Sequence, residues 1–330
     1  MVSSRRIRSK DAFSRIGKLS RRIVLPIVGA LLLVASNSFG QAKVGTTGAQ
    51  FLELGVSARA MGMAEAFTAV VDDITAVYYN PAGLTTLYGK ELAVSYVAMP
   101  ADVGFGFAAF GLPLESIGGV LAFSATGLTS GDMIETTYED GTINGTGRSF
   151  AYNALAAGVS YGRYLTDRFS VGFTVRGIFE RAHDYGANGW SADVGTSYNT
   201  GFRNFRIGMA ITNFGPDMRF IDNAYPLPIN FKFGGSINVL EQTDNVLTFS
   251  AEGSHPSDNL EKFNAGAEWI FKDFVALRAG GRFNYDVDGF TVGGGLRLPF
   301  GEERELRVDY AFQDFGILTE IHRFTLNMAF

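Results

Sequence analysis

The sequence predicts an all-β protein: a transmembrane antiparallel β-barrel of about 14 strands with a small N-terminal helical plug. From Glu91 onward, segment after segment alternates apolar and polar residues with period two, and no apolar run is long enough for a membrane helix. Glycine (41 of 330 residues) and aromatic residues (13%) are abundant, which suits a tapered barrel interior and aromatic girdles. A secretory leader precedes the plug and the barrel.

The leader is the segment from Met1 to Gly40, which we expect to be a signal peptide. Its basic beginning is followed by an apolar run, Ile23 to Ala35, whose 13 residues are too few to span a bilayer. Small residues come next, so we expect cleavage after Gly40 or Ala42. Arg21 and Arg22 resemble a twin-arginine signal. That route exports folded cargo, whereas a barrel must cross unfolded, so we expect the general export route.

The charge balance and the absence of cysteine exclude several classes of function. The chain has 28 basic and 33 acidic residues, of which eight basic residues and one acidic residue lie in the leader. The chain without the leader therefore has 20 basic and 32 acidic residues and a net charge of −12. We therefore expect no nucleic-acid partner. Without cysteine the chain has no disulfide framework, no lipoprotein anchor and no thiolate chemistry.

Residues 41–90 differ from the strands that follow, and we expect them to form the plug. They contain a helix-forming run, Ala58 to Val70, and later a turn in which Pro81 excludes helical geometry for its predecessor and Gly83 allows the chain to reverse. Such a compact segment buries little surface alone, so it needs the barrel interior to pack on.

Charged residues in this segment are expected to hold it in place. Arg59 is expected to bond an inward-facing carboxylate such as Glu268, although the sequence does not choose the partner. For Asp72 and Asp73, capping a short helix or pairing with an arginine of the lumen is favoured over binding a cation. The residues assigned to the plug motif are Arg59, Gly62, Asp72, Asp73, Asn80, Pro81 and Gly83.

The alternation defines fourteen strand segments, an even number as single-chain bacterial barrels require, within a range of about 12 to 16. They are 91–97, 103–110, 119–126, 150–162, 169–179, 189–199, 205–212, 227–239, 246–253, 262–271, 275–283, 290–298, 305–312 and 322–330. An even number places both chain ends on the periplasmic side. Long connections are expected outside the cell and short ones in the periplasm. The long ones are 127–149, 181–188 and 213–226, and the short ones are 163–168, 200–204 and 272–274.

Charged residues lie opposite the apolar series of the strands. We expect them to line the lumen or to contact the plug. These residues are Arg176, Asp193, Arg206, Lys232, Glu268, Arg278, Arg282, Arg297 and Asp309. The strands of a soluble β-sandwich would also alternate apolar and polar residues, and these charged side chains would then lie on its solvent faces. The leader and the last residue, Phe330, which closes an alternating strand, favour the barrel. We expect Phe330 to be the assembly signal that the barrel-assembly machinery recognises. We expect outer-membrane lipid to surround the barrel.

The sequence contains no pattern typical of catalysis or metal binding. His183, His255 and His322 map to outer loops or outer strand ends and have no second ligand at helical or strand spacing. Gly293 to Gly295 lies inside an alternating strand with no helix after it, which favours close backbone approach or barrel curvature over a phosphate loop. We therefore expect no catalytic residue, no metal, no cofactor and no enzymatic activity.

Two outer loops are the expected contact surfaces. The loop 127–149 is acidic and rich in small polar residues, which is typical of a solvated loop, and it is the largest exposed element. The loop 213–226 is more apolar, and its Phe214, Phe220 and Tyr225 are the expected anchors for a bound partner.

Several short motifs between Phe51 and Leu87 resemble the N-terminal signature of the PorV/PorQ family of outer-membrane barrels and, more distantly, the plug of FadL-type transporters. The match covers about a tenth of the chain. It departs from the signature at Tyr79, where a Trp is expected, and at Ala64-Glu65, where a second Gly is expected. The matching residues are Gly55, Ala58-Arg59-Ala60, Gly62-Met63, Ala66-Phe67-Thr68-Ala69-Val70, Asp72-Asp73 and Asn80-Pro81-Ala82-Gly83-Leu84.

The PorV/PorQ resemblance implies a role in type IX protein secretion: binding exported proteins at the outer membrane and passing them to the attachment machinery. Its implied partners are secreted cargo proteins and other secretion components. The FadL resemblance implies instead a channel for hydrophobic small molecules that the plug gates. The closer motif match favours secretion. Both place the mature chain in the outer membrane of a Gram-negative-type bacterium.

Overall fold

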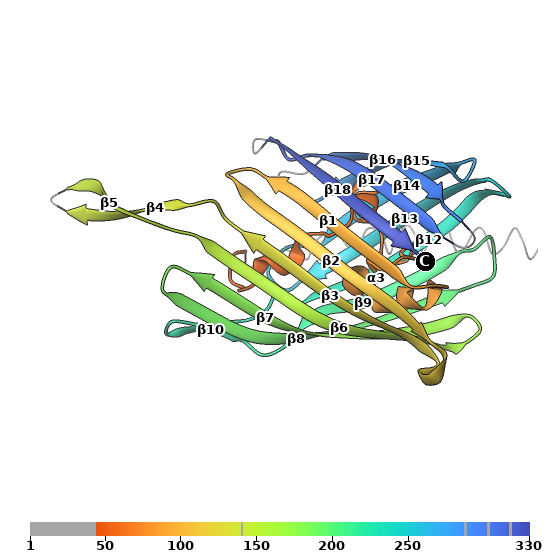
Figure 1. Cartoon of the computed structure of the whole chain (residues 1–330), viewed down its shortest axis with the longest axis horizontal. Helices are drawn as coiled ribbons and strands as arrows, with labels where there is room; N and C mark the ends of the chain where they lie inside the picture. Colours follow the sequence, from red (N-terminus) through yellow and green to blue (C-terminus); the bar gives the residue numbers. More distant parts are fainter. Residues whose placement is uncertain (1–43, 140, 287–288, 302–303, 317–318) are drawn as a thin grey trace, which may run out of the picture. The chain divides into compact units, whose positions relative to one another are not determined.

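The computed structural model describes residues 44–139, 141–286, 289–301, 304–316 and 319–330, so the expected signal peptide lies outside the described residues. Fourteen strands of the described part close into one antiparallel barrel, as the sequence predicts (Figure 1). They are β1 (Glu91–Met99), β2 (Val103–Leu114), β3 (Gly119–Thr129), β6 (Tyr152–Thr166), β7 (Phe169–Ala182), β8 (Tyr185–Asn199), β9 (Arg206–Phe214), β12 (Asn230–Gln242), β13 (Asn245–Pro256), β14 (Lys262–Phe271), β15 (Val275–Phe283), β16 (Phe290–Pro299), β17 (Glu305–Asp314) and β18 (Glu320–Ala329).

Closure comes from the pairing of β1 with β18, in which Glu91 lies opposite Ala329. Successive side chains of a strand point to opposite faces. In β7, Phe173 and Val175 are accordingly 50% and 55% exposed on the outside, whereas Thr174 and Arg176 are buried on the inside. The period-two pattern of the sequence is thus the inside and outside of the barrel wall.

The described residues before β1, 44–90, lie inside the barrel and contain four short helices: η2 (Gln50–Glu53), α2 (Ala58–Gly62), α3 (Ala76–Tyr79) and η3 (Pro81–Thr86). None of the helices in the described ranges is long and apolar enough to cross a membrane. The helical run expected from Ala58 to Val70 ends early, at Gly62. The cause is a left-handed backbone at Ala64 (φ 56°) and Glu65 (φ 64°), the position at which the motif resemblance expects a glycine.

The plug runs from one end of the barrel to the other. We call the end that carries the β3–β6 connection the outer end, and the end that carries Phe330 the inner end. Gly48 N donates to Pro226 O (2.9 Å) at the outer end, and Lys90 pairs with Phe330 at the inner end. The expectation that both chain ends share one side therefore holds for the barrel strands but not for the start of the plug, because the plug crosses the barrel.

The apolar core lies between the plug and the inner face of β1, β2 and β3. Met61, Phe67 and Ile74 of the plug pack there with Phe105 and Phe107 of β2. The remaining strands present mostly polar side chains to the interior. The plug therefore has one apolar and one polar side, and the barrel wall matches both.

Three connections differ from the sequence prediction. The expected loops 127–149 and 213–226 contain two-stranded sheets, formed by β4 (Met133–Glu139) with β5 (Thr142–Phe150) and by β10 (Met218–Phe220) with β11 (Asn223–Tyr225). The expected long loop 181–188 is wrong: β7 and β8 stay paired up to Ala182 and Tyr185, and a positive φ of 53° at His183 closes a tight turn. A short helix, η4 (Glu115–Ile117), joins β2 to β3.

Candidate functional site

Arg59 of α2 is the centre of the contact between plug and wall. It is buried, and its Nε and Nη2 each donate to one carboxylate oxygen of Glu268 on β14, both at 2.8 Å. Its Nη1 donates to Asp73 (3.1 Å) and to Asp72. Burial disfavours the charged guanidinium, but the carboxylates of Asp72 and Glu268 outweigh burial and hold the pKa of Arg59 above its usual value. A buried charge is stable only with such multiple partners.

This ion pair continues into the barrel wall. Glu268 also accepts from Arg278 Nε of β15 (2.6 Å), and Arg278 Nη1 donates to Asp309 of β17 (2.6 Å). All three side chains are buried. The structure thus brings together three of the charged residues expected in the lumen and connects them to the plug through Arg59.

Backbone groups of the plug bond side chains of the wall as well. Glu252 accepts from the N–H groups of Phe67 (3.0 Å) and Thr68 (2.8 Å), and Thr325 Oγ1 accepts from Ala58 N (2.9 Å). Short helices leave many N–H groups without a partner in the helix, and a buried one must find an acceptor elsewhere. The polar wall supplies these acceptors.

The turn at Asn80 and Pro81 docks on wall glycines. The Asn80 side chain caps η3 by accepting from Ala82 N (3.2 Å) and donates to Thr196 O of β8 (3.0 Å). A Cβ atom on Gly195 would lie only 2.1 Å from Asn80 Oδ1. Gly83 has a different role from the expected chain reversal: a Cβ there would meet Val71 O at 2.7 Å, so the position demands small size.

Gly62 of the plug and Gly293 of β16 meet in the same way. A Cβ on Gly293 would lie 3.0 Å from Gly62 Cα. The interpretation of Gly293 as a site of close backbone approach is therefore confirmed. A Cβ atom at either position would require the plug or the wall to move by a few tenths of an ångström.

Among the described residues, the other charged residues assigned to the lumen form no ion pair with this cluster. In the outer half, Arg176 pairs with Asp193, which also accepts from Asn213 N (2.7 Å). Arg206 lines the inner end, and Arg297 donates to Asp273 (3.3 Å) near the same end. Lys232 and Arg282 line a chamber in the outer half.

The plug separates two cavities. The outer chamber has a volume of about 160 Å³, and an inner cavity of about 1200 Å³ opens beneath the plug. Among the described residues the two share no lining residue: Glu65 and Tyr78 face the chamber, whereas Val71 and Asp72 face the inner cavity. A third cavity, of about 590 Å³ at the outer mouth, shares Lys262 with the chamber. The plug is thus the barrier in the barrel.

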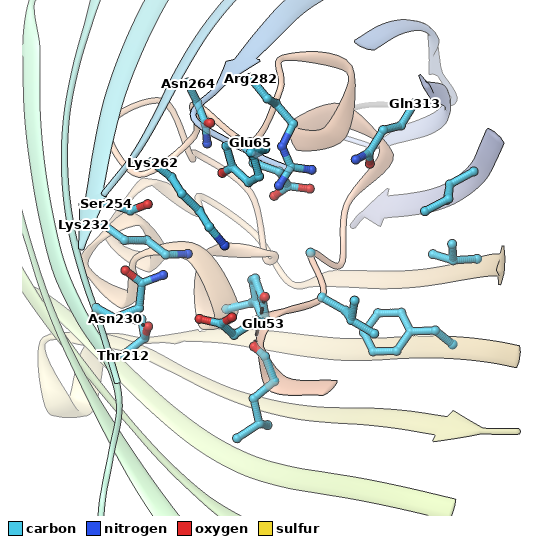
Figure 2. A pocket seen from close by; sticks show the side chains of 18 of the residues that line it. Glu53, Glu65, Thr212, Asn230, Lys232, Ser254, Lys262, Asn264, Arg282 and Gln313 are labelled. Carbon is cyan, nitrogen blue, oxygen red and sulfur yellow. Dashed lines mark hydrogen bonds between the residues drawn. The ribbon is translucent and has the colours of Figure 1, made fainter. Parts of the chain in front are cut away.

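The chamber has a polar wall and an apolar wall (Figure 2). Lys232 and Lys262 point into it from β12 and β14. Among the described residues, no carboxylate lies within 4 Å of either ammonium group; Lys232 Nζ lies 5.6 Å from the ring centre of Tyr78, and Lys262 Nζ lies 5.0 Å from that of Tyr285. The opposite wall consists of Val97, Met99, Phe105 and Ile321. Sequence reasoning assigned Lys232 to the lumen but missed Lys262 and the apolar wall.

The outer-loop aromatic residues do not form one surface. Phe214 is 60% exposed and Tyr225 is 41% exposed, but Phe220 packs against the apolar cluster that contains Met218 and Leu227. At the inner end the ring of Phe330 stacks on Phe110 at 6.4 Å. In the described ranges no three His, Cys, Asp or Glu side chains gather as metal ligands.

No protein-family model matches the chain, and neither does any curated protein. Similar solved structures include the CymD monoaromatic hydrocarbon channel (12% identity, 84% of this chain and 98% of that chain, TM-score 0.56). The toluene transporter TbuX of Ralstonia pickettii has 14% identity over 83% and 97% of the two chains, with a TM-score of 0.56. A Pseudomonas aeruginosa FadL homologue has 13% identity over 83% and 98%, with a TM-score of 0.50. The chain has the fold of FadL-type outer-membrane barrels; none of these comparisons supports the PorV/PorQ resemblance.

Proposed function

We propose that the protein is an outer-membrane channel for small hydrophobic solutes and that the plug is its gate. The observation that carries this proposal is the arrangement of two cavities in one closed barrel with only the plug between them. The similar structures support the class, since their names describe a hydrocarbon channel and a toluene transporter. In this view the structure is the closed state, and a solute passes when the plug shifts.

The chamber walls indicate which solutes fit. The apolar wall of Val97, Met99 and Phe105 suits a hydrocarbon body, because such contact removes apolar surface from water. The two lysines opposite suit an acidic or strongly polar substituent. Hydrophobic solutes that carry one such substituent therefore match both walls.

The secretion role rests on the motif residues alone. Asn80, Pro81 and Gly62 hold the plug against the wall, and a gated channel needs that contact as much as a secretion component does. Of the three expected anchors for cargo, Phe220 packs inward. The channel is therefore the better supported function.

Uptake of labelled toluene tests the proposal, in cells that have no hydrocarbon channel of their own. Cells that carry the assembled barrel should take up toluene faster than cells that do not, with sucrose uptake unchanged. An assembled barrel that leaves toluene uptake unaltered would contradict the channel. Exported proteins that co-purify with the barrel, and are lost from an F214S/F220S/Y225S variant, would support secretion instead.

A further inference from the structure

The outward face of the barrel wall carries a recess near the outer end. It has a volume of about 630 Å³ and extends over β1, β2, β3, β6, β7 and β8. Elsewhere this face carries large exposed apolar side chains such as Phe173, Val175 and Phe233. The recess is a local gap in that apolar layer.

The strand register explains the gap. Gly106 of β2 lies opposite Gly127 of β3, and the next residues in this row are Tyr96 of β1 and Leu155 of β6. Adjacent strands lie about 4.8 Å apart, so two neighbouring glycines leave the wall bare over about 10 Å. Tyr96 is 57% exposed and Leu155 is 47% exposed, and they form the two sides. The floor and sides can hold an extended hydrocarbon chain.

The next row toward the outer end is polar. Along it Thr129, Asn153 and Arg181 are cross-strand neighbours, and Thr129 Oγ1 donates to Asn153 Oδ1 (2.9 Å). Arg181 is exposed, and in the described part of the chain no carboxylate lies within 4 Å of it. The adjacent Glu180 accepts instead from the Tyr152 hydroxyl. An uncompensated cation thus stands at the rim of an apolar recess.

We propose that this recess binds a phosphate-bearing lipid of the outer leaflet. An acyl chain lies on Gly106 and Gly127 between Tyr96 and Leu155, and the phosphate accepts hydrogen bonds from Arg181. Two observations select this occupant. The recess is continuous with the apolar face that contacts membrane lipid, and the forked guanidinium complements a phosphate. The unbroken pairing of β3 with β6 shows that the recess is a surface site and does not open into the lumen. The proposal does not depend on solute transport.

Native mass spectrometry of the full-length, delipidated barrel tests the site with lipid A and with an uncharged diacylglycerol as probes. The variant G106L/G127L fills the floor, and R181Q removes the rim charge. R181Q should weaken lipid A binding about tenfold, the loss of one charge-assisted contact, and leave diacylglycerol binding unchanged. G106L/G127L should weaken binding of both.

The matched controls are A157L, an added leucine on an exposed outward position of β6 beyond the recess, and R219Q, the loss of another exposed arginine. Both should bind lipid A as the wild type does. Heat-shifted mobility on gels checks that each variant assembles, and R181Q keeps the test decisive should the double leucine variant not assemble. Equal lipid A binding by R181Q and wild type would overturn the proposal. The proposal would also be overturned if a second copy of the chain, and not a lipid, occupied the recess. Such a copy would be detected as a dimer that R181Q or G106L/G127L abolishes.

Discussion

Arg59 and Glu268 form a two-point ion pair, with both nitrogen–oxygen distances at 2.8 Å, although they lie 209 residues apart in the chain. The pair joins the plug to β14, and both side chains are buried. In the proposed channel, this contact helps to hold the plug in its closed position between the two cavities.

Replacing Arg59 by Ala should loosen the plug. Loss of one partner of a buried ion pair leaves the other charge uncompensated and costs about 3–5 kcal/mol. Arg278 still bonds Glu268, but Asp72 and Asp73 also lose their bonds to Arg59, so we expect the loss to fall within that range. We expect faster toluene uptake and faster protease cleavage within the plug. An R59K variant, which keeps the charge but loses the two-point geometry, should fall between, and R219A at the exposed outer end should match the wild type.

The wall glycines beneath the plug should tolerate no side chain. A Cβ on Gly208 would lie 2.4 Å from Thr68 O, whereas one on Gly253 would meet its nearest atom at 3.6 Å, an ordinary contact. G208A should therefore displace the plug and lower the temperature at which the plug becomes protease-sensitive. G253A serves as the control and should leave it unchanged. Equal behaviour of the two variants would contradict the close docking.

These features show what a sequence pattern can and cannot specify. The barrel was predictable because alternation is local: each strand carries its own inside and outside. The apolar inner face of β2 was not predictable. Phe105 points to the plug and Phe110 of the same strand lies on the outward face, so both faces of β2 are apolar and polarity does not alternate along it. The sequence named Glu268 as a possible partner of Arg59, but only the strand register decides between it and other carboxylates. The motif residues pack and bond the plug to the wall, so they identify a plug and do not choose between secretion and transport.

The lysines of the chamber should select among solutes. Lys232 and Lys262 face the chamber, which Glu53 and Glu252 also line, and among the described residues no carboxylate lies within 4 Å of either ammonium group. We expect an acidic solute to contact the two lysines directly. The variant K232M/K262M should reduce benzoate uptake about tenfold, the loss of a charge-assisted contact, and leave toluene uptake unchanged. K272M, which removes an exposed lysine between β14 and β15, is the matched control. Unchanged benzoate uptake in the double variant would show that the lysines do not contact the solute.

The orientation of the barrel can be tested with single cysteines, because the chain has none of its own. Thr137 lies on the exposed β4–β5 hairpin at the outer end, and Asp273 lies in a turn at the inner end. A cysteine at Thr137 should react with an impermeant thiol reagent on intact cells, and one at Asp273 should react only after the cells are broken. The reverse pattern would mean that the outer and inner ends are exchanged.

A reversible disulfide between plug and wall tests the central claim, that the plug must move for a solute to pass. Thr325 Oγ1 accepts a hydrogen bond from Ala58 N (2.9 Å), so the two residues are in contact across plug and wall. The variant A58C/T325C is designed at this contact, and its cross-linked fraction is measured by mass spectrometry. The control N238C/T248C joins the two wall strands β12 and β13 at a cross-strand pair whose side-chain oxygens lie 3.0 Å apart. We expect oxidation to abolish toluene uptake through A58C/T325C, a reductant to restore it, and the wall-only pair to transport in both states. Undiminished uptake through a fully cross-linked A58C/T325C barrel would contradict the gate.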